Sequence, residues 1–285
     1  MIPSPRSYAL VSGVLLSTLF VFESKAHALP EDEALRLCLT KSRTSTIQDA
    51  LGECRQRLGL DMSSAATLCS VARVLRTRGE MHEALKAAQR ARTLEPRKVD
   101  AWNLEGSLLL DMNHEAEAVT ALRQVIRLAP DSLAGYLRLG IALRRLERYE
   151  EAITVYRAAL KIAPERADLL NNLAVVLRKQ GKHDDAITLL QESLRRTPGD
   201  FDIQLNLAIA LRAANRYAEA AQLYEAAIEK RPGHFDLLFD LAATYAKMKR
   251  NDTAIRLYHR YIEAVQTRDP QAALRARAEV EELKR

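Results

Sequence analysis

Three arginines and two asparagines recur at a fixed interval along this chain. The step from Arg144 to Arg178 equals the step from Arg178 to Arg212, and Asn172 and Asn206 are separated by the same step. We call this step the repeat interval. A guanidinium binds carboxylates through charge-assisted hydrogen bonds, and an amide can both donate to and accept from a peptide backbone. Arranged in rows, these side chains predict the binding of an extended or acidic protein segment.

The same repeat interval governs three further sets of residues. The prolines of one set are Pro96, Pro130, Pro164, Pro198 and Pro232. The alanines of a second set are Ala84, Ala118, Ala152, Ala186, Ala220 and Ala254. A third set contains only small residues: Ala72, Gly106, Gly140, Ala174, Ala208 and Ala242. Three sets in phase over six copies indicate a repeat array, in which each copy is one supersecondary unit.

Each copy has the pattern of two helices, as the copy that begins at Leu133 illustrates. One apolar face of a first helix is formed by Tyr136, Leu139, Gly140 and Leu143. The apolar face of a second helix is formed by Ala152, Ile153, Tyr156, Ala159 and Leu160. Pro164 ends the second helix because it lacks an N–H group and clashes with the preceding turn. Gly140 and Ala152 have almost no side chain, so the two backbones can approach closely.

This pattern resembles the tetratricopeptide repeat, W-x₂-L-G-x₂-Y…A-x₃-F…P. The residues that match it in one copy are Tyr136, Leu139, Gly140, Leu143, Ala152, Tyr156 and Pro164, and Trp102 supplies the tryptophan of another copy. The resemblance implies an all-α fold, a right-handed α-solenoid of helix-turn-helix repeats. Glu105 departs from the pattern, because it replaces the expected leucine.

The repeat register divides the chain into four segments. Residues 65–268 hold six repeats, and residues 269–285 form a C-terminal capping helix that begins at Asp269 and Pro270. Residues 29–64 follow the register loosely, so we expect a degenerate N-terminal repeat that acts as a cap. Its apolar residues in phase are Ala34, Leu37, Ala50, Leu51 and Leu58.

The N-terminal segment, residues 1–28, has the layout of a secretory signal. Arg6 provides a positive start, residues 9–22 form a weakly polar to apolar run, and Ala26-His27-Ala28 is a small-x-small triplet. We expect cleavage after Ala28 and a periplasmic or secreted protein. The run is shorter than the roughly 20 apolar residues of a membrane-spanning helix. The alternative is an uncleaved segment that anchors the protein in the inner membrane, the only case in which we expect membrane contact.

Three cysteines then belong to an exported chain, in which thiols can oxidise. By the repeat pattern, Cys38 and Cys54 lie at the same height on adjacent antiparallel helices and both point inward, which predicts a disulfide. Cys69 is the thiol left over. The alternative is that Cys38 and Cys54 are two packed free thiols.

The sequence contains no pattern typical of an enzyme. It has no HExxH motif, no glycine-rich phosphate loop and no GxSxG motif, and the repeats occupy most of the chain. We therefore expect no catalytic residue, no metal, no cofactor and no small-molecule substrate. The formal net charge of +6 is a mild excess over 285 residues, and no basic face carries interleaved aromatic residues, so nucleic acid is not an expected partner either.

The resemblance implies that the first helices line a concave groove, and it assigns residues to that groove by repeat position. The polar residues so assigned are Arg138, Arg144, Asn171, Asn172, Arg178, Lys179, Asn206, Arg212 and Lys247. The alternative for the basic residues is that they only offset the dipoles of helix C-termini. A second alternative places the binding surface on the convex face, at Tyr149 and Tyr217.

Together these features predict a non-enzymatic scaffold whose groove binds an extended or acidic segment of a partner protein in the periplasm. The resemblance extends to the superhelical repeats of protein glycosyltransferases, whose asparagine ladders bind extended peptides, but it covers only the repeats. The alternative function is that of an assembly factor or chaperone of a cell-envelope machine for secretion, pilus formation, polysaccharide export or cytochrome biogenesis. That alternative is an analogy at the level of the fold.

Overall fold

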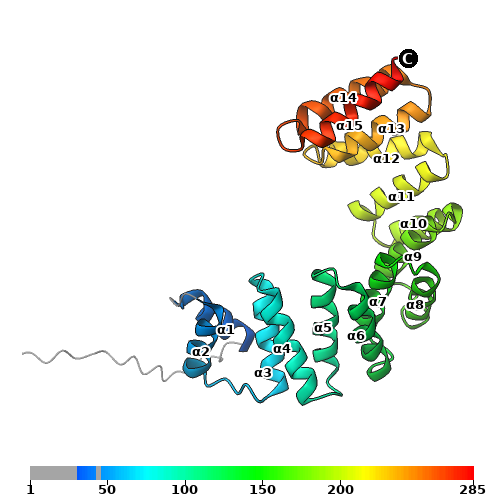
Figure 1. Ribbon diagram of the computed structural model, residues 1–285. Helices are drawn as coiled ribbons and strands as arrows, with labels where there is room; N and C mark the ends of the chain where they lie inside the picture. The colour runs from blue at the N-terminus through cyan, green and yellow to red at the C-terminus, as the bar shows by residue number, and fades with distance from the viewer. Residues whose placement is uncertain (1–30, 43–45) are drawn as a thin grey trace, which may run out of the picture.

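The computed structural model describes residues 31–42 and 46–285, and within these ranges the chain forms fifteen α-helices and no strand. The helices follow one another along an arc (Figure 1). One arm contains α1–α6, the bend lies at α7–α10, and the other arm contains α11–α15. The prediction of an all-α solenoid is confirmed. The predicted signal segment, residues 1–28, lies outside the described residues.

Six helix pairs make up most of the solenoid. Their first helices are α3 (Ala65–Thr77), α5 (Val99–Asp111), α7 (Leu133–Arg145), α9 (Ala167–Lys179), α11 (Phe201–Ala213) and α13 (Asp236–Lys247). Their second helices are α4 (Met81–Leu94), α6 (Glu115–Leu128), α8 (Tyr149–Ile162), α10 (His183–Arg196), α12 (Tyr217–Lys230) and α14 (Asn251–Val265). Nearly all of these helices begin one repeat interval after the corresponding helix of the preceding pair.

Each first helix is followed by a residue with positive φ that reverses the chain. These residues are Gly79, Asn113, Glu147, Gly181, Asn215 and Lys249. At the end of α7, the Glu147 N–H donates to Arg144 O at 3.1 Å and the Arg148 N–H donates to Leu143 O at 2.9 Å. These two bonds form a Schellman motif, which satisfies carbonyl groups that the helix leaves unpaired. The tight turn sends the second helix back antiparallel to the first.

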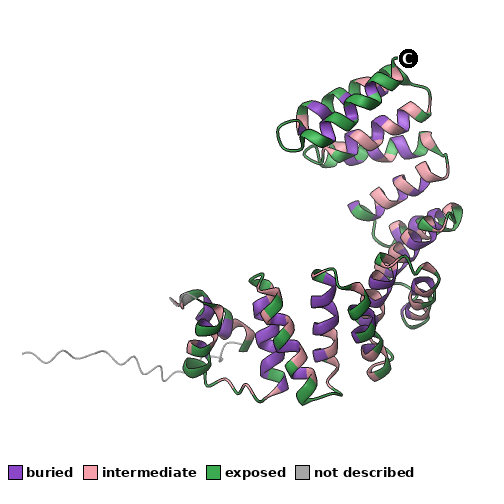
Figure 2. Cartoon of the chain, in the orientation of Figure 1, coloured by how far each residue is buried: buried purple, intermediate pink, exposed green. Residues whose placement is uncertain are grey.

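The small residues of the repeat lie where helices approach most closely. All six alanines that recur at the repeat interval are fully buried, from Ala84 to Ala254. A Cβ atom on Gly106 would lie 2.6 Å from Leu122 Cγ, and one on Gly140 would overlap the Tyr156 ring. Each of these glycines therefore leaves space that a large side chain of the second helix fills. Buried residues accordingly lie on the faces at which the helices meet (Figure 2).

Glu105, the departure from the repeat pattern, is buried and keeps a charged partner. Arg92 on α4 lies 2.7 Å from it, measured from Nε to Oε2, and the Arg92 guanidinium stacks over the Trp102 ring. Burial nevertheless raises the pKa of the Glu105 carboxyl, because desolvation outweighs the charge of Arg92. The departure is thus accommodated by a local ion pair.

The contacts between helices determine which side of the arc is concave. The second helix of each pair packs against the first helix of the next pair. Successive first helices also contact one another from α3 to α11. Because the first helices approach one another directly, the solenoid curves toward them. They therefore line the inner, concave side.

The N-terminal unit does not repeat this packing. It contains α1 (Glu31–Lys41) and α2 (Ile47–Leu58), and α1 rather than α2 packs against α3. The predicted apolar register is wrong at Leu37 and Leu58, which are exposed, whereas Leu35 and Leu39 are buried. The physical reason is that Asp32 on α1 reaches Arg73 on α3 at 2.6 Å, while α2 packs mainly against α1 and leaves Leu58 at the edge of the array.

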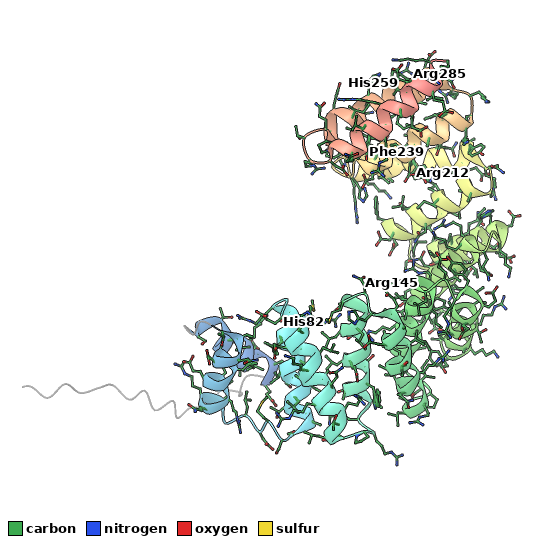
Figure 3. All side chains as sticks on the ribbon, in the orientation of Figure 1. His82, Arg145, Arg212, Phe239, His259 and Arg285 are labelled. Atoms are coloured by element: carbon green, nitrogen blue, oxygen red, sulfur yellow. A yellow bond between two sulfur atoms is a disulfide. The ribbon has the colours of Figure 1, made fainter. Side chains whose placement is uncertain are left out.

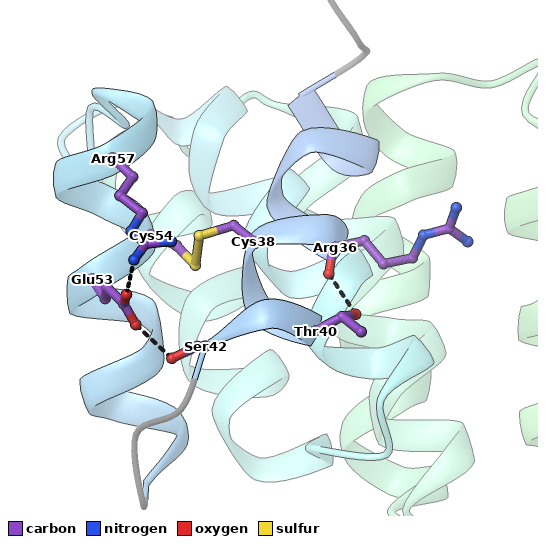
Figure 4. Close-up of a disulfide and its surroundings, with 7 residues drawn as sticks. All are labelled: Arg36, Cys38, Thr40, Ser42, Glu53, Cys54 and Arg57. Carbon is purple, nitrogen blue, oxygen red and sulfur yellow. Dashed lines mark hydrogen bonds and ion pairs between the residues drawn. A yellow bond between two sulfur atoms is a disulfide. The ribbon is translucent and has the colours of Figure 1, made fainter. Parts of the chain in front are cut away.

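The structure joins Cys38 on α1 to Cys54 on α2 through a disulfide, with 5.7 Å between the Cα atoms (Figure 4). Beside it, the Ser42 hydroxyl donates to Glu53 Oε2 at 2.6 Å, which also ties the two helices together. Cys69 is a buried free thiol on α3, and burial raises the pKa of that thiol. The predicted pairing, with Cys69 left over, is the one that the structure contains.

At the other end, α15 (Pro270–Leu283) packs against α14. Asp269 caps it by accepting a hydrogen bond from the Ala272 N–H at 2.9 Å. Its buried residues include Ala273, Ala276 and Val280, and Ala276 lies one repeat interval after Ala242. The helix therefore occupies the place of a seventh first helix. None of the helices in the described part of the chain is long and apolar enough to span a membrane.

Candidate binding groove

The predicted row of arginines lies along the concave side, near the C-termini of three neighbouring first helices. Arg144 belongs to α7, Arg178 to α9 and Arg212 to α11. The pKa of Arg178 is lowered mainly by burial and further by the charges of Arg212 and Arg144. The three cations are thus close enough to repel one another. Arg145, the next residue on α7, lies on the inner side of the bend (Figure 3).

The arginines of the row differ in their partners. Arg212 forms an ion pair with Asp240 on α13, with 3.0 Å between Nη2 and Oδ1. Within the described residues, Arg144 and Arg178 have no ion pair, and the buried Nε atom of each has no hydrogen-bond acceptor. Asn206 lies one repeat interval before Asp240, and Asn172 lies two repeat intervals before it. The positions that correspond to Asp240 in the two preceding repeats therefore carry an amide instead of a carboxylate.

A fourth arginine of this row was missed in the sequence. Arg76 on α3 lies two repeat intervals before Arg144. Its Nε atom is 2.7 Å from Asp111 Oδ2 at the end of α5. Leu110 occupies the corresponding place between them, which interrupts the row. The repeat interval alone would have identified Arg76 if the row had been traced toward the N-terminus.

Buried tyrosines lie beneath the arginines. Tyr156 on α8 and Tyr224 on α12 are fully buried, and in the described chain neither hydroxyl has a hydrogen-bond partner. Burial raises the pKa of both phenols, while Arg144 near Tyr156 and Arg212 and Arg178 near Tyr224 act in the opposite direction. Both phenols therefore stay neutral at physiological pH, and they fill the space beneath the row of cations.

A pocket of about 250 Å³ opens beside this row. It is lined by Arg178, Ile209, Arg212, Ala213, Tyr217, Ala243 and Lys247. Two arginines and a lysine thus surround an apolar surface, a combination that suits an acidic side chain with its aliphatic carbons. Tyr217, assigned to the convex face in the alternative interpretation, lines this pocket together with Arg178 and Lys247. Lys247 comes from α13, so three first helices contribute to the pocket.

The asparagines are partly used within the protein. Asn206 Nδ2 donates to Asn171 Oδ1 at 3.0 Å, across the contact between α11 and α9. Asn172 Nδ2 donates to Asp168 O at 2.7 Å, within α9. Asn172 and Asn206 are therefore not equivalent, although they share a repeat position. In the described chain, the Asn171 amide N–H groups and Asn206 Oδ1 have no partner and remain available to a peptide backbone.

Two predicted groove residues lie outside the arginine row. Arg138 on α7 is half-buried and donates from Nη1 to Asn103 Oδ1 on α5 at 3.1 Å. Burial lowers the pKa of this arginine. Lys179 is exposed at the end of α9. The structure therefore brings together Arg144, Arg178, Arg212 and Lys247, and it places Arg138 with the asparagines.

The groove-forming repeats also match known families. A tetratricopeptide repeat model matches residues 72–132, 103–167, 137–201 and 171–235, and a second tetratricopeptide repeat model matches residues 211–278. The chain belongs to the tetratricopeptide repeat family. Tetratricopeptide repeat proteins generally mediate protein–protein interaction. No protein of curated function matches this tetratricopeptide repeat chain significantly.

Solved structures resemble this tetratricopeptide repeat protein in fold. YrrB, described as a tetratricopeptide repeat protein with an unusual peptide-binding site, has 23% identity and a TM-score of 0.53, covering 68% of this chain and 99% of its own. Pseudomonas aeruginosa pilF has 20% identity and a TM-score of 0.61, and the match covers 78% of this chain and 99% of the pilF chain. A tetratricopeptide repeat protein from Parabacteroides merdae has 12% identity and a TM-score of 0.66, and the match covers 90% of this chain and 99% of that protein. At these identities the likeness concerns the fold.

Proposed function

We propose that this protein is a non-enzymatic scaffold whose concave groove binds an acidic, extended segment of a partner protein. The observation that carries the proposal is the pair Arg144 and Arg178, which have no acidic partner within the described residues although each has a buried Nε atom. A carboxylate from a partner would supply the negative charge that both arginines lack and would form charge-assisted hydrogen bonds with their guanidinium groups.

The surroundings of the two arginines support a peptide rather than a small anion. The pocket at Arg178, Arg212 and Lys247 combines cations with apolar lining, which suits a whole acidic side chain. The asparagines nearby leave amide groups for a backbone. YrrB, a protein of similar fold, is described as having a peptide-binding site. The described residues contain no group of three or more His, Cys, Asp or Glu side chains that could hold a metal ion.

The N-terminal segment suggests where the protein works. A secretory signal in residues 1–28 would deliver the protein to the periplasm or the medium, where the Cys38–Cys54 disulfide is stable. The partner would then be another exported protein. A role in assembling a cell-envelope machine is the second candidate, as an analogy at the level of the fold. If the segment is not cleaved, the same groove would work at the inner membrane.

The binding proposal is tested by chemical crosslinking in cells followed by pull-down of the protein. We expect the wild type to capture a partner that the variant Arg144→Gln/Arg178→Gln captures at least about tenfold less. The matched control is Arg127→Gln/Arg157→Gln, which removes two exposed arginines of second helices that have no ion pair within the described residues. Equal capture by both variants and the wild type would mean that the groove is not the binding surface.

The proposal on location is tested separately by mass spectrometry of the native protein. We expect an N-terminus at Leu29 in a periplasmic fraction. Recovery of residues 1–28 in a membrane fraction would support the anchored alternative instead.

A further inference from the structure

The spacing of the cations along the groove restricts the conformation of the bound segment. Packed helices lie about 8–10 Å apart. The hydrogen bond of 3.0 Å between Asn206 on α11 and Asn171 on α9 joins two short side chains and agrees with this separation. Arg144, Arg178 and Arg212 share one repeat position on neighbouring first helices, so the cations that they carry should recur at about the same step.

Common peptide conformations differ in how well they match this step. On one face of a β-strand, side chains recur at about 6.7 Å or about 13 Å. In a polyproline II helix every third side chain lies on the same face, about 9.3 Å apart. In an α-helix every seventh side chain lies on nearly the same face, about 10.5 Å apart. The spacing therefore favours the polyproline II helix and the α-helix over an alternating strand.

The asparagines distinguish the two remaining conformations. The backbone groups of an α-helix are bonded internally, whereas those of a polyproline II helix have no internal hydrogen bonds. The Asn171 N–H groups and Asn206 Oδ1, which have no partner in the described chain, can bond only the second kind of backbone. An aliphatic row at Ile141, Val175 and Ile209, which also recur at the repeat interval and are half-buried, offers apolar contact beside the arginines.

We infer that the groove recognises a polyproline II segment that carries an acidic residue at every third position. Successive carboxylates would pair with Arg144 and with Arg178, and the following one would enter the pocket beside Lys247. The two intervening residues of each triplet turn away from the arginines, toward the aliphatic row or the solvent. The inference rests on the proposed function, because it specifies the segment that the same groove would bind.

The test measures the binding of synthetic peptides to the purified protein by fluorescence anisotropy. The first peptide has glutamate at every third position among prolines. The second has the same composition with its glutamates at every second position. The third is an alanine-rich helical peptide with glutamates at every seventh position. We expect the first peptide to bind about tenfold tighter than either of the others. The second peptide would pair one fewer carboxylate, and the third would offer no free backbone groups to the asparagines.

Protein variants show whether the preference arises in the groove. Arg144→Gln/Arg178→Gln should abolish the preference for the first peptide, and Arg127→Gln/Arg157→Gln should preserve it. Equal binding of the first two peptides would overturn the inferred spacing of the acidic residues, although the proposal that the groove binds acidic segments would still stand. Tighter binding of the helical peptide would overturn the inferred conformation. If no acidic peptide binds, the proposed function itself fails.

Discussion

The arginine row differs between its ends and its middle in whether each arginine has an acidic partner. Arg76 at one end pairs with Asp111, and Arg212 at the other end pairs with Asp240. Arg144 and Arg178 in the middle have no such partner in the described chain. A shared repeat position therefore does not make the arginines equivalent. What decides their availability is the residue that the next first helix places beside them.

The same contrast between end and middle applies to packing. The helices of the N-terminal unit are joined by a disulfide, and a Cβ added to Gly52 on α2 would meet no atom within 4 Å. In the middle, a Cβ added to Gly140 would overlap the Tyr156 ring. The N-terminal end is thus held by a covalent link and local pairs, and the middle is held by dense packing. The proposed binding surface lies on the densely packed part.

Removal of the disulfide should have the largest effect on stability. The variant Cys38→Ser/Cys54→Ser should lose roughly 3 kcal/mol of unfolding free energy in the N-terminal unit, because a loop of about 15 residues is no longer closed. Hydrogen exchange should show the loss in α1 and α2, while binding of an acidic peptide stays unchanged. A parallel loss of peptide affinity would mean that the N-terminal unit takes part in binding.

Adding one methyl group should have opposite effects at the two glycines. Gly140→Ala should destabilise the protein by roughly 1–3 kcal/mol, because the Tyr156 ring must move. Gly52→Ala should stabilise it by about 0.5–1 kcal/mol, because alanine is favoured over glycine inside a helix and the site is open. Chemical denaturation measures both values. Changes of the same sign would refute the difference in packing.

Freeing Arg212 should extend the unpaired middle of the row. Asp240→Asn removes the partner of Arg212, so we expect an acidic peptide to bind about two- to fivefold tighter. Isothermal titration calorimetry measures the affinity. The control variant is Asp111→Asn, which frees Arg76 beyond the gap at Leu110 and should change the affinity less. An unchanged affinity in Asp240→Asn would show that Arg212 lies outside the binding surface.

Asp240 also predicts a pH dependence. Burial raises the pKa of this carboxyl, and its effect exceeds the opposing effect of Arg212. The folded state therefore binds the proton more tightly than the unfolded state. The resulting stabilisation is complete below the ordinary aspartate pKa of about 4 and is lost as the pH rises through the raised pKa. Relative to Asp240→Asn, the unfolding free energy of the wild type should fall over that range, as acid-to-neutral denaturation curves would show.

Much of the fold could be predicted because its signals repeat. The repeat interval predicted the helix pairs, and the small residues such as Gly140 predicted close approach between helices. The N-terminal register could not be predicted at Leu37 and Leu58, because α1 rather than α2 packs against α3 and no regular repeat pattern encodes that arrangement.

The groove could be predicted only in outline. The row at Arg144, Arg178 and Arg212 followed from spacing, but its state of pairing depends on contacts between helices that the spacing does not specify. Asp240 neutralises Arg212 through a contact between α11 and α13 that the spacing of the arginines does not reveal. Tyr217 lies at a turn, so its position in the pocket became visible only from the packing of α11 and α13 around it.

The most direct test of the account compares four single substitutions in one binding assay. The protein variants are Arg76→Gln, Arg144→Gln, Arg178→Gln and Arg212→Gln, and the ligand is the proline peptide with glutamate at every third position. We predict that Arg144→Gln and Arg178→Gln each weaken binding about tenfold, whereas Arg76→Gln and Arg212→Gln each change it less than about threefold. Equal losses in all four variants would contradict the claim that only the unpaired middle of the row binds the partner.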